Sequence, residues 1–508
     1  MAVAATHAGT YERAPGRVAL ATGALRALAR HVPIALTLGL VVGIHVPTLH
    51  FYFFGDDFLV IGDINSRSFP AYMRDVFLLR DLTPNWRPLT MLVYWGEFKA
   101  FGFNALPWRI VNLSLHAASV LMLYVLLLSM TKRVFVSTMA ALIFGVSASA
   151  VHTVTYVTAL PHVLSELFLL TALYSLYRYV AGGERRAAWY WLSFLLYVAG
   201  FLANEGGVVI GVVLLVYYAM ASLYKRRDVL DFTMKMLPFG IAATLLVSGL
   251  SGCGCQGVEG GFYGIGWHIP RETWVYMSRL AYPVGAIPLE PSALEWAIGS
   301  VVAGVAIFFL IRGPNVARWA AVGLVTGLMP YVPGKIWTAT RYTYMSVPFF
   351  AILVAIAAGW VHHHFARFNR YIAHGLAALA LVAVGGLYGW QTLHQTQPFL
   401  HETDRWRVLT TELREQYPTV PEGNTVYIAD DDGVWSNAYW QPTWMTSVGR
   451  ALYGKDVSLR AFTSTDVLRV RESLDGEMYL VREQDGHLER VTPEELRAVI
   501  QRSAVNGD

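Results

Sequence analysis

The sequence is dominated by apolar runs that are long enough to cross a membrane. A helix needs roughly 20 apolar residues to span the hydrocarbon core of a bilayer. Runs near this length lie at about 32–54, 108–130, 134–151, 157–180, 187–203, 206–223, 232–252, 294–311, 316–332, 342–361 and 371–393. The sequence therefore predicts a mainly α-helical, polytopic membrane protein with about eleven transmembrane helices.

The composition supports a membrane protein and excludes several other classes. Hydrophobic residues make up 55% of the 508 residues and charged residues only 15%, against roughly 25% charged residues in soluble domains. The net charge of +4 is too small to indicate a nucleic-acid partner, and no basic run accompanies a nucleic-acid motif. Cys253 and Cys255 are the only cysteines, which excludes a disulfide scaffold and a multi-cysteine zinc site.

The distribution of basic residues predicts the topology. Residues 1–30 form an Arg-rich leader, and the first apolar run ends in large aromatics rather than a cleavage site, so we expect a retained first span. Basic residues favour the cytoplasmic side, which places the N-terminus inside and, with an odd number of spans, the C-terminus outside. The other segments on the predicted inner side are also basic: Lys132–Arg133, Arg185–Arg186, Lys225–Arg227, Arg312 with Arg318, and Arg367 with Arg370.

Two regions are too polar to lie within the bilayer. The first is the outer loop at 55–107, within the transmembrane part at 31–395. Apolar residues recur in this loop at helical spacing, which predicts one or two amphipathic helices on the membrane surface. Residues 400–508 have the composition of a small extracytoplasmic α/β domain, with a helix at 404–417 and strands at 425–429 and 478–482. A closing helix follows Thr492, which forms a capping box with Glu495.

The sharpest candidate for chemistry is the acidic pair Asp56–Asp57, directly after the first span. A carboxylate partly withdrawn from water has a raised pKa and suits a general base. The pair can instead bind Mg²⁺ or Mn²⁺, which prefer carboxylate oxygens. A solvated turn that caps a helix is the third interpretation.

Other polar residues are predicted to gather at the same membrane face. Arg341 opens an Arg-Tyr-x-Tyr run at the outer end of a late span. Its planar guanidinium can hold a lipid-linked phosphate by paired hydrogen bonds, or it can be an ordinary interfacial arginine. The remaining candidates for substrate binding are Lys335, Arg87, His152, His162 and Glu205. No spacing typical of metal ligands is present among the histidines.

These residues form an ordered set of motifs. After the acidic pair come Trp86-Arg87-Pro88-Leu89-Thr90, Val111-Asn112 with His116, His152-Thr153, Asn204-Glu205 and Arg341-Tyr342-Thr343-Tyr344. In this order the chain resembles the GT-C class of multi-span glycosyltransferases, in particular the transmembrane part of tetratricopeptide-type O-mannosyltransferases and their bacterial relatives. It departs from that pattern at Val154, where an acid is frequent, at Asn204, where Lys is usual, and in lacking tetratricopeptide repeats.

The resemblance implies a glycosyltransferase that uses a sugar carried on a polyprenyl or dolichyl phosphate. It implies that Asp56 is the base, that Asp57 orients it or binds acceptor or metal, that Arg341 meets the donor phosphate, and that transfer inverts the sugar. The acceptor hydroxyl can belong to a protein, a glycolipid or a cell-wall polymer at the outer face of a bacterial plasma membrane. A lipid transporter or flippase and a noncatalytic scaffold are the alternatives; a transporter is expected to show internal repeats.

Overall fold

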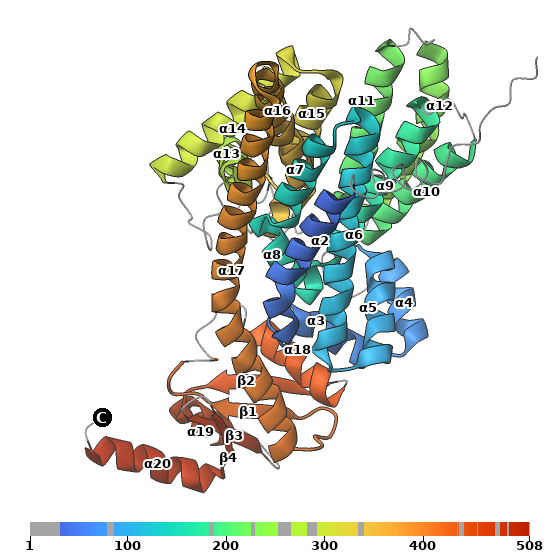
Figure 1. Cartoon of the computed structure of the whole chain (residues 1–508). Coiled ribbons are helices and arrows are strands. Elements are labelled where there is room, and N and C mark those ends of the chain that lie inside the picture. Colours follow the sequence, from blue (N-terminus) through green and yellow to red (C-terminus); the bar gives the residue numbers. More distant parts are fainter. Residues whose placement is uncertain are drawn as a thin grey trace, which may run out of the picture.

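The computed structural model describes most of the chain beyond residue 30. The described residues are 31–78, 86–181, 187–224, 229–251, 266–281, 292–333, 340–433, 435, 441–454, 456–472, 478–484 and 487–506. A large helical bundle occupies one end of the molecule, and a small domain with a β-sheet occupies the other (Figure 1).

Every apolar run identified in the sequence contains a helix. These helices are α2 (Val32–His45), which continues as the 3₁₀ turn η1 (Val46–His50), α6 (Ala105–Thr131), α7 (Val134–Gly145) with α8 (Ala148–Thr155), η2 (Val157–Ala159) with α9 (Leu160–Ala181), α10 (Ala187–Ala203), α11 (Val208–Tyr224), α12 (Val229–Ser251), α14 (Ala293–Arg312), α15 (Asn315–Leu328), α16 (Val347–Phe368) and α17 (Arg370–Gln416).

The number of these helices that can cross a membrane is smaller. Within the described residues, six helices are long and apolar enough, or seven when the pair α7 and α8, bent by 58°, is counted as one span. The chain is a multi-pass membrane protein, but the expected count of about eleven spans is not confirmed. Several apolar runs form helices that are short: α10 covers 17 residues and α15 covers 14, below the roughly 20 residues that a perpendicular span needs.

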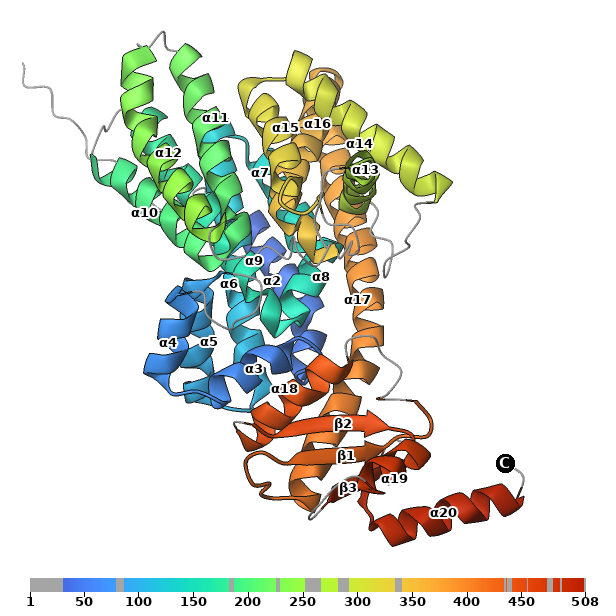
Figure 2. The ribbon, with the colours of Figure 1, turned by 180° about the vertical axis from the view of Figure 1, so that it is seen from behind.

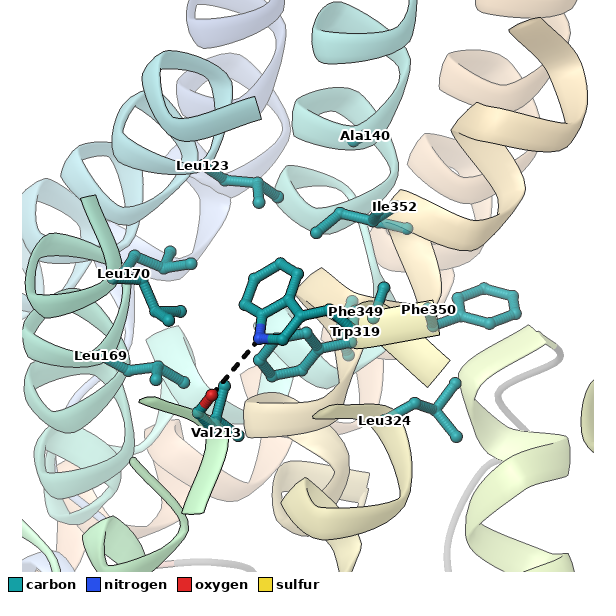
Figure 3. Close-up of a cluster of buried hydrophobic side chains, with 14 of the residues drawn as sticks. Leu123, Ala140, Leu169, Leu170, Val213, Trp319, Leu324, Phe349, Phe350 and Ile352 are labelled. Carbon is teal, nitrogen blue, oxygen red and sulfur yellow. Dashed lines mark hydrogen bonds between the residues drawn. The ribbon is translucent and has the colours of Figure 1, made fainter. Parts of the chain in front are cut away.

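The bundle core is packed around a buried tryptophan. Trp319 of α15 lies among aliphatic side chains from α6, α7 and α9 (Figure 3). Its indole N–H donates a hydrogen bond to the carbonyl oxygen of Val213 at 3.4 Å, and its ring meets Phe349 edge-on at 5.3 Å. A Cβ at Gly323 would lie 2.4 Å from Phe349. Small residues at such crossings let helices approach closely where lipid supplies no hydrophobic driving force.

The first outer loop forms three described helices, one more than the most expected from the sequence. They are α3 (Asp57–Asn65), α4 (Phe69–Leu78) and α5 (Pro88–Phe101). The expected placement of these helices on the membrane surface stays a prediction. Two residues of the apolar repeat, Tyr72 and Val76, lie on α4 and are buried within the protein. The third residue of that repeat, Leu79, lies outside the described residues.

Helix α17 joins the bundle to the small domain without a break. The expected boundary near residue 400 falls within this helix, since its 47 residues contain both the last apolar run and the predicted helix at 404–417. At 1.5 Å per residue it is about 70 Å long. Leu379 and Val382 in its first part are exposed, whereas Trp406 and Leu413 are buried in the domain.

The small domain is a four-stranded mixed sheet flanked by helices (Figures 1 and 2). Its elements after α17 are β1 (Thr425–Ala429), α18 (Gln441–Tyr453), β2 (Ser458–Phe462), α19 (Ser464–Glu472), β3 (Tyr479–Gln484), β4 (His487–Arg490) and α20 (Pro493–Asn506). The order is β2-β1-β3-β4, with parallel pairs except for the antiparallel β3–β4 hairpin. The predicted strands and the Thr492–Glu495 capping box are confirmed.

Candidate active site

The acidic pair lies at the turn that leads from the first span into α3. Gly55 adopts a left-handed conformation with φ of +53°, which a residue without a Cβ adopts at little cost. Asp56 then occupies the N-cap position of α3, yet its side chain caps no backbone N–H. The geometry therefore does not support the interpretation that the Asp56 side chain caps α3.

Asp57 is completely buried and all its contacts are within the protein. One carboxylate oxygen accepts hydrogen bonds from the Thr158 N–H at 3.0 Å and the Thr158 hydroxyl at 3.3 Å. The other accepts from the Phe54 N–H at 3.3 Å and lies 3.4 Å from a guanidinium nitrogen of Arg109, which is also fully buried. Burial raises the pKa of Asp57 to about 6, although Arg109 and the two amides oppose that shift. These contacts fix the loop to α6 and to the start of α9.

Asp56 is the accessible member of the pair. Its side chain is 34% exposed, and one oxygen accepts a hydrogen bond from the Trp444 indole N–H at 3.0 Å. The other oxygen faces a guanidinium nitrogen of Arg341 at 3.6 Å. One carboxylate, one cation and one indole donor thus come together from three distant parts of the sequence.

Arg341 is held in place by aromatic rings. It belongs to the 3₁₀ helix η4 (Thr340–Ser346), and its guanidinium carbon lies 5.2 Å from the ring centre of Tyr156 and 5.4 Å from that of Tyr342. Tyr342 in turn stacks on Tyr331 with ring centres 4.9 Å apart. Cation–π contacts of this kind orient a guanidinium without neutralising it.

A second polar cluster adjoins the first through Tyr331. The buried His162 has its Nδ1 atom 3.2 Å from both the Tyr331 hydroxyl and the Asn204 side-chain nitrogen. Next to Asn204, Glu205 forms a bidentate ion pair with Arg87, at 2.7 Å and 2.5 Å. Arg87 is therefore engaged by two short hydrogen bonds to its carboxylate, whereas Arg341 lies 3.6 Å from the carboxylate of Asp56.

The motifs that are far apart in the sequence contact one another. Asn112 donates a side-chain hydrogen bond to the Tyr156 carbonyl oxygen at 3.0 Å. His116 lies 2.7 Å from the Tyr344 hydroxyl, and Thr90 donates to the Ala203 carbonyl oxygen at 2.7 Å. The ordered motif set is thus one connected structural unit.

Two of the sequence candidates remain unplaced. Lys335 lies outside the described residues. His152 lies on α8, but its side chain is not among those described.

Comparison with solved structures identifies the fold. The chain aligns with the archaeal oligosaccharyltransferase AglB from Archaeoglobus fulgidus in complex with an inhibitory peptide and a dolichol-phosphate, with a TM-score of 0.53 and 11% sequence identity over 84% of this chain and 64% of that one. The apo form and a form tethered to an acceptor peptide both give a TM-score of 0.50 at the same identity and coverage. The chain has the GT-C fold. It spans about 64% of the length of these oligosaccharyltransferases. No family model and no curated protein matches the sequence.

The described contacts of the acidic pair can be compared with the ligands that a divalent cation needs. Among the described residues no three His, Cys, Asp or Glu side chains converge as metal ligands. Asp57 directs its oxygens to N–H and hydroxyl donors and to Arg109, and Asp56 faces Arg341 and an indole donor. A divalent cation prefers several anionic or carbonyl oxygens, so the described contacts do not fit the Mg²⁺ or Mn²⁺ role suggested for the pair.

Two residues of the candidate site were not identified from the sequence. Trp444 belongs to α18 in the small domain, and no local pattern connects it with Asp56. Tyr331 lies shortly before the undescribed segment that holds Lys335 and joins both polar clusters. A buried partner for Arg109 could have been expected from the sequence, because a cation at the start of an apolar run needs a partner.

Proposed function

We propose that the chain is a GT-C-type glycosyltransferase that moves a sugar from a polyprenyl-phosphate carrier to an acceptor hydroxyl at the extracytoplasmic face of the plasma membrane. The observation that carries this proposal is the placement of the accessible Asp56 carboxylate beside the Arg341 guanidinium. Such a pair offers a proton acceptor and a phosphate-binding cation within one site. The GT-C fold supports the assignment.

The donor would be recognised through its phosphate. The Arg341 side chain is 22% exposed, and its guanidinium lies near two tyrosine rings; a planar guanidinium can make a bidentate contact with phosphate. AglB is described in complex with a dolichol-phosphate, which is consistent with a lipid-phosphate donor here. Lys335, in the segment just before Arg341, is proposed as a second cation for the same phosphate.

Asp56 is proposed as the general base in a single displacement. The acceptor hydroxyl oxygen forms a bond to the anomeric carbon, and its proton passes to Asp56. The bond between that carbon and the phosphate oxygen breaks, and polyprenyl phosphate leaves with the bonding electrons while Arg341 offsets its charge. One displacement inverts the anomeric centre. Asp57 is unsuited to this role, since it is buried and bonded on both oxygens.

The surrounding polar groups would line the substrate region. His162 lies 3.2 Å from the Tyr331 hydroxyl, Arg87 of the Arg87–Glu205 ion pair is an electrostatic neighbour of Tyr331, and His152 lies on α8. The acceptor class stays open between a protein, a glycolipid and a cell-wall polymer. The N-terminus would be cytoplasmic and the C-terminal domain extracytoplasmic.

The test uses the full-length protein in nanodiscs with a panel of polyprenyl-phosphate monosaccharides. Release of free polyprenyl phosphate is measured for the wild type, for Asp56→Asn and for Asp63→Asn. Asp63 is a matched control because it lies on the same helix and pairs with Arg67 at 3.0 Å. We expect Asp56→Asn to lose about 10²–10⁴ in turnover with donor binding intact, and Asp63→Asn to stay active. Normal turnover in Asp56→Asn, or donor movement across the bilayer without phosphate release, would exclude the proposed chemistry.

A further inference from the structure

The C-terminal domain is docked on the loop that carries the candidate base. Helix α18 lies directly against α3 in both views (Figures 1 and 2). The helices cross so closely that a Cβ at Gly62 would lie 2.5 Å from the Ser447 carbonyl oxygen. At the end of α3, the Asn65 side chain donates to the carbonyl oxygens of Ala451 at 3.0 Å and Arg450 at 3.4 Å in the last turn of α18.

Helix α17 contacts the segment that precedes the acidic pair. Arg407 donates to the His50 carbonyl oxygen at 2.7 Å, and the Thr410 hydroxyl bonds the Tyr52 hydroxyl at 3.1 Å. Phe58, just after the pair, packs against Trp406 with ring centres 5.2 Å apart. The segment that presents Asp56 is thus anchored by the C-terminal domain both before and after the acid.

Trp444 is the point of contact with Asp56 itself. Its ring lies 3.6 Å from the position that a Cβ at Gly55 would take, so the indole covers the turn. Its N–H then donates to one Asp56 oxygen at 3.0 Å. The neighbouring Trp406 packs near it, with ring centres 6.3 Å apart, but directs its own N–H to Glu402 at 2.8 Å.

We propose that Trp444 is a positioning residue for Asp56, and that the C-terminal domain is therefore an integral part of the active site. This inference rests on the proposed function. A hydrogen bond to one carboxylate oxygen fixes the rotamer of a partly exposed side chain, and it leaves the other oxygen facing Arg341 and the substrate side. A hydrogen bond to a charged group contributes enough to change a rate by about ten- to one-hundred-fold.

The experiment compares two tryptophan-to-phenylalanine variants of the full-length protein. Both remove an indole N–H from the same aromatic cluster, but only Trp444→Phe removes the donor to Asp56. We expect Trp444→Phe to lower kcat about ten- to one-hundred-fold with little change in the donor KM, and Trp406→Phe to keep kcat near the wild-type value. The acid limb of the pH–rate profile should move to higher pH in Trp444→Phe alone, because a donor to the charged carboxylate is lost.

A second variant separates positioning from folding. Trp444→His keeps an aromatic ring with an N–H donor, so it should recover part of the kcat lost in Trp444→Phe. Equal loss in the histidine and phenylalanine variants, or an unchanged pH profile, would overturn the inference. Full activity of Trp444→Phe alongside an inactive Asp56→Asn would overturn it while leaving the proposed function standing. Full activity of Asp56→Asn would instead remove the proposed function itself.

Discussion

The buried pair of Asp57 and Arg109 gives the most quantitative prediction for stability. Both side chains are fully buried and their charged atoms are 3.4 Å apart. Replacing Arg109 by Met removes the cation and leaves the carboxylate in a dry site. Breaking a buried ion pair in this way costs about 3–5 kcal/mol. A partly exposed pair such as Arg67–Asp63, with side chains 22% and 21% exposed, contributes about 1 kcal/mol or less.

The pH dependence of this cost follows from the raised pKa of Asp57. Burial places that pKa at about 6, above its ordinary value of 3.8. The stability that the protonated Asp57 contributes is therefore fully present below its ordinary pKa of 3.8, and it is lost as the pH rises through about 6. The shift of about two units corresponds to about 3 kcal/mol. Without Arg109 the pKa rises further, so Arg109→Met should be most destabilising near pH 7.5 and much less so near pH 5, where the carboxyl takes a proton.

The assay is thermal unfolding of the purified protein in nanodiscs at pH 5 and pH 7.5. Arg67→Met is the control, since it removes an exposed partner of the same kind. The double variant Arg109→Met with Asp57→Asn should recover part of the lost stability, because removing both charges of a buried pair is far less harmful than removing one. The reasoning is wrong if Arg109→Met and Arg67→Met lower the unfolding temperature equally, or if the effect of Arg109→Met is the same at both pH values.

Three further outcomes are expected. Burial raises the pKa of Glu97 to about 8, so the stability it contributes falls as pH rises through 8, and Glu97→Gln should be the more heat-stable protein at pH 9 in a thermal scan. Gly62→Ala places a Cβ 2.5 Å from Ser447 and should lower the unfolding temperature through a cost of about 1–3 kcal/mol, while Gly96→Ala, with open space around it, should not. Arg341→Lys keeps the charge and loses the planar fork, so the donor KM should rise about tenfold with kcat less affected.

The membrane part was predictable because its signal is local. Each apolar run formed a helix, since hydrophobic length is a property of neighbouring residues. The span count was less predictable, because apolar runs such as those of α10 and α15 form helices of only 17 and 14 residues. In addition, α7 ends at Gly145 and α8 turns away by 58°. The continuity of the helix across the expected boundary near residue 400 could not be predicted from composition. Composition changes there, but helical geometry continues through α17.

The roles of the candidate site residues stay predictions, but the structure shows which of these residues contact one another. Asp56 lies beside Arg341, and Glu205 lies beside Arg87. The Arg87–Glu205 pairing could not be derived, since Arg87 was expected to bind substrate and its partner lies more than a hundred residues away. The contact of Trp444 with Asp56 could not be predicted from the sequence. Trp444 lies on α18, which follows the long helix α17 and contacts α3 only in the folded chain.

The two adjacent acids illustrate why a dipeptide motif needs a structure before roles are assigned. Successive residues at a helix start point about 100° apart, since a turn holds 3.6 residues. With Gly55 turning the chain, Asp57 enters the protein and Asp56 stays at the surface. The buried acid ties the turn to Arg109 and Thr158, and this fixes the backbone from which Asp56 projects. Asp57→Asn should therefore reduce activity through a displaced Asp56, together with a lower unfolding temperature, whereas Asp56→Asn should reduce activity alone.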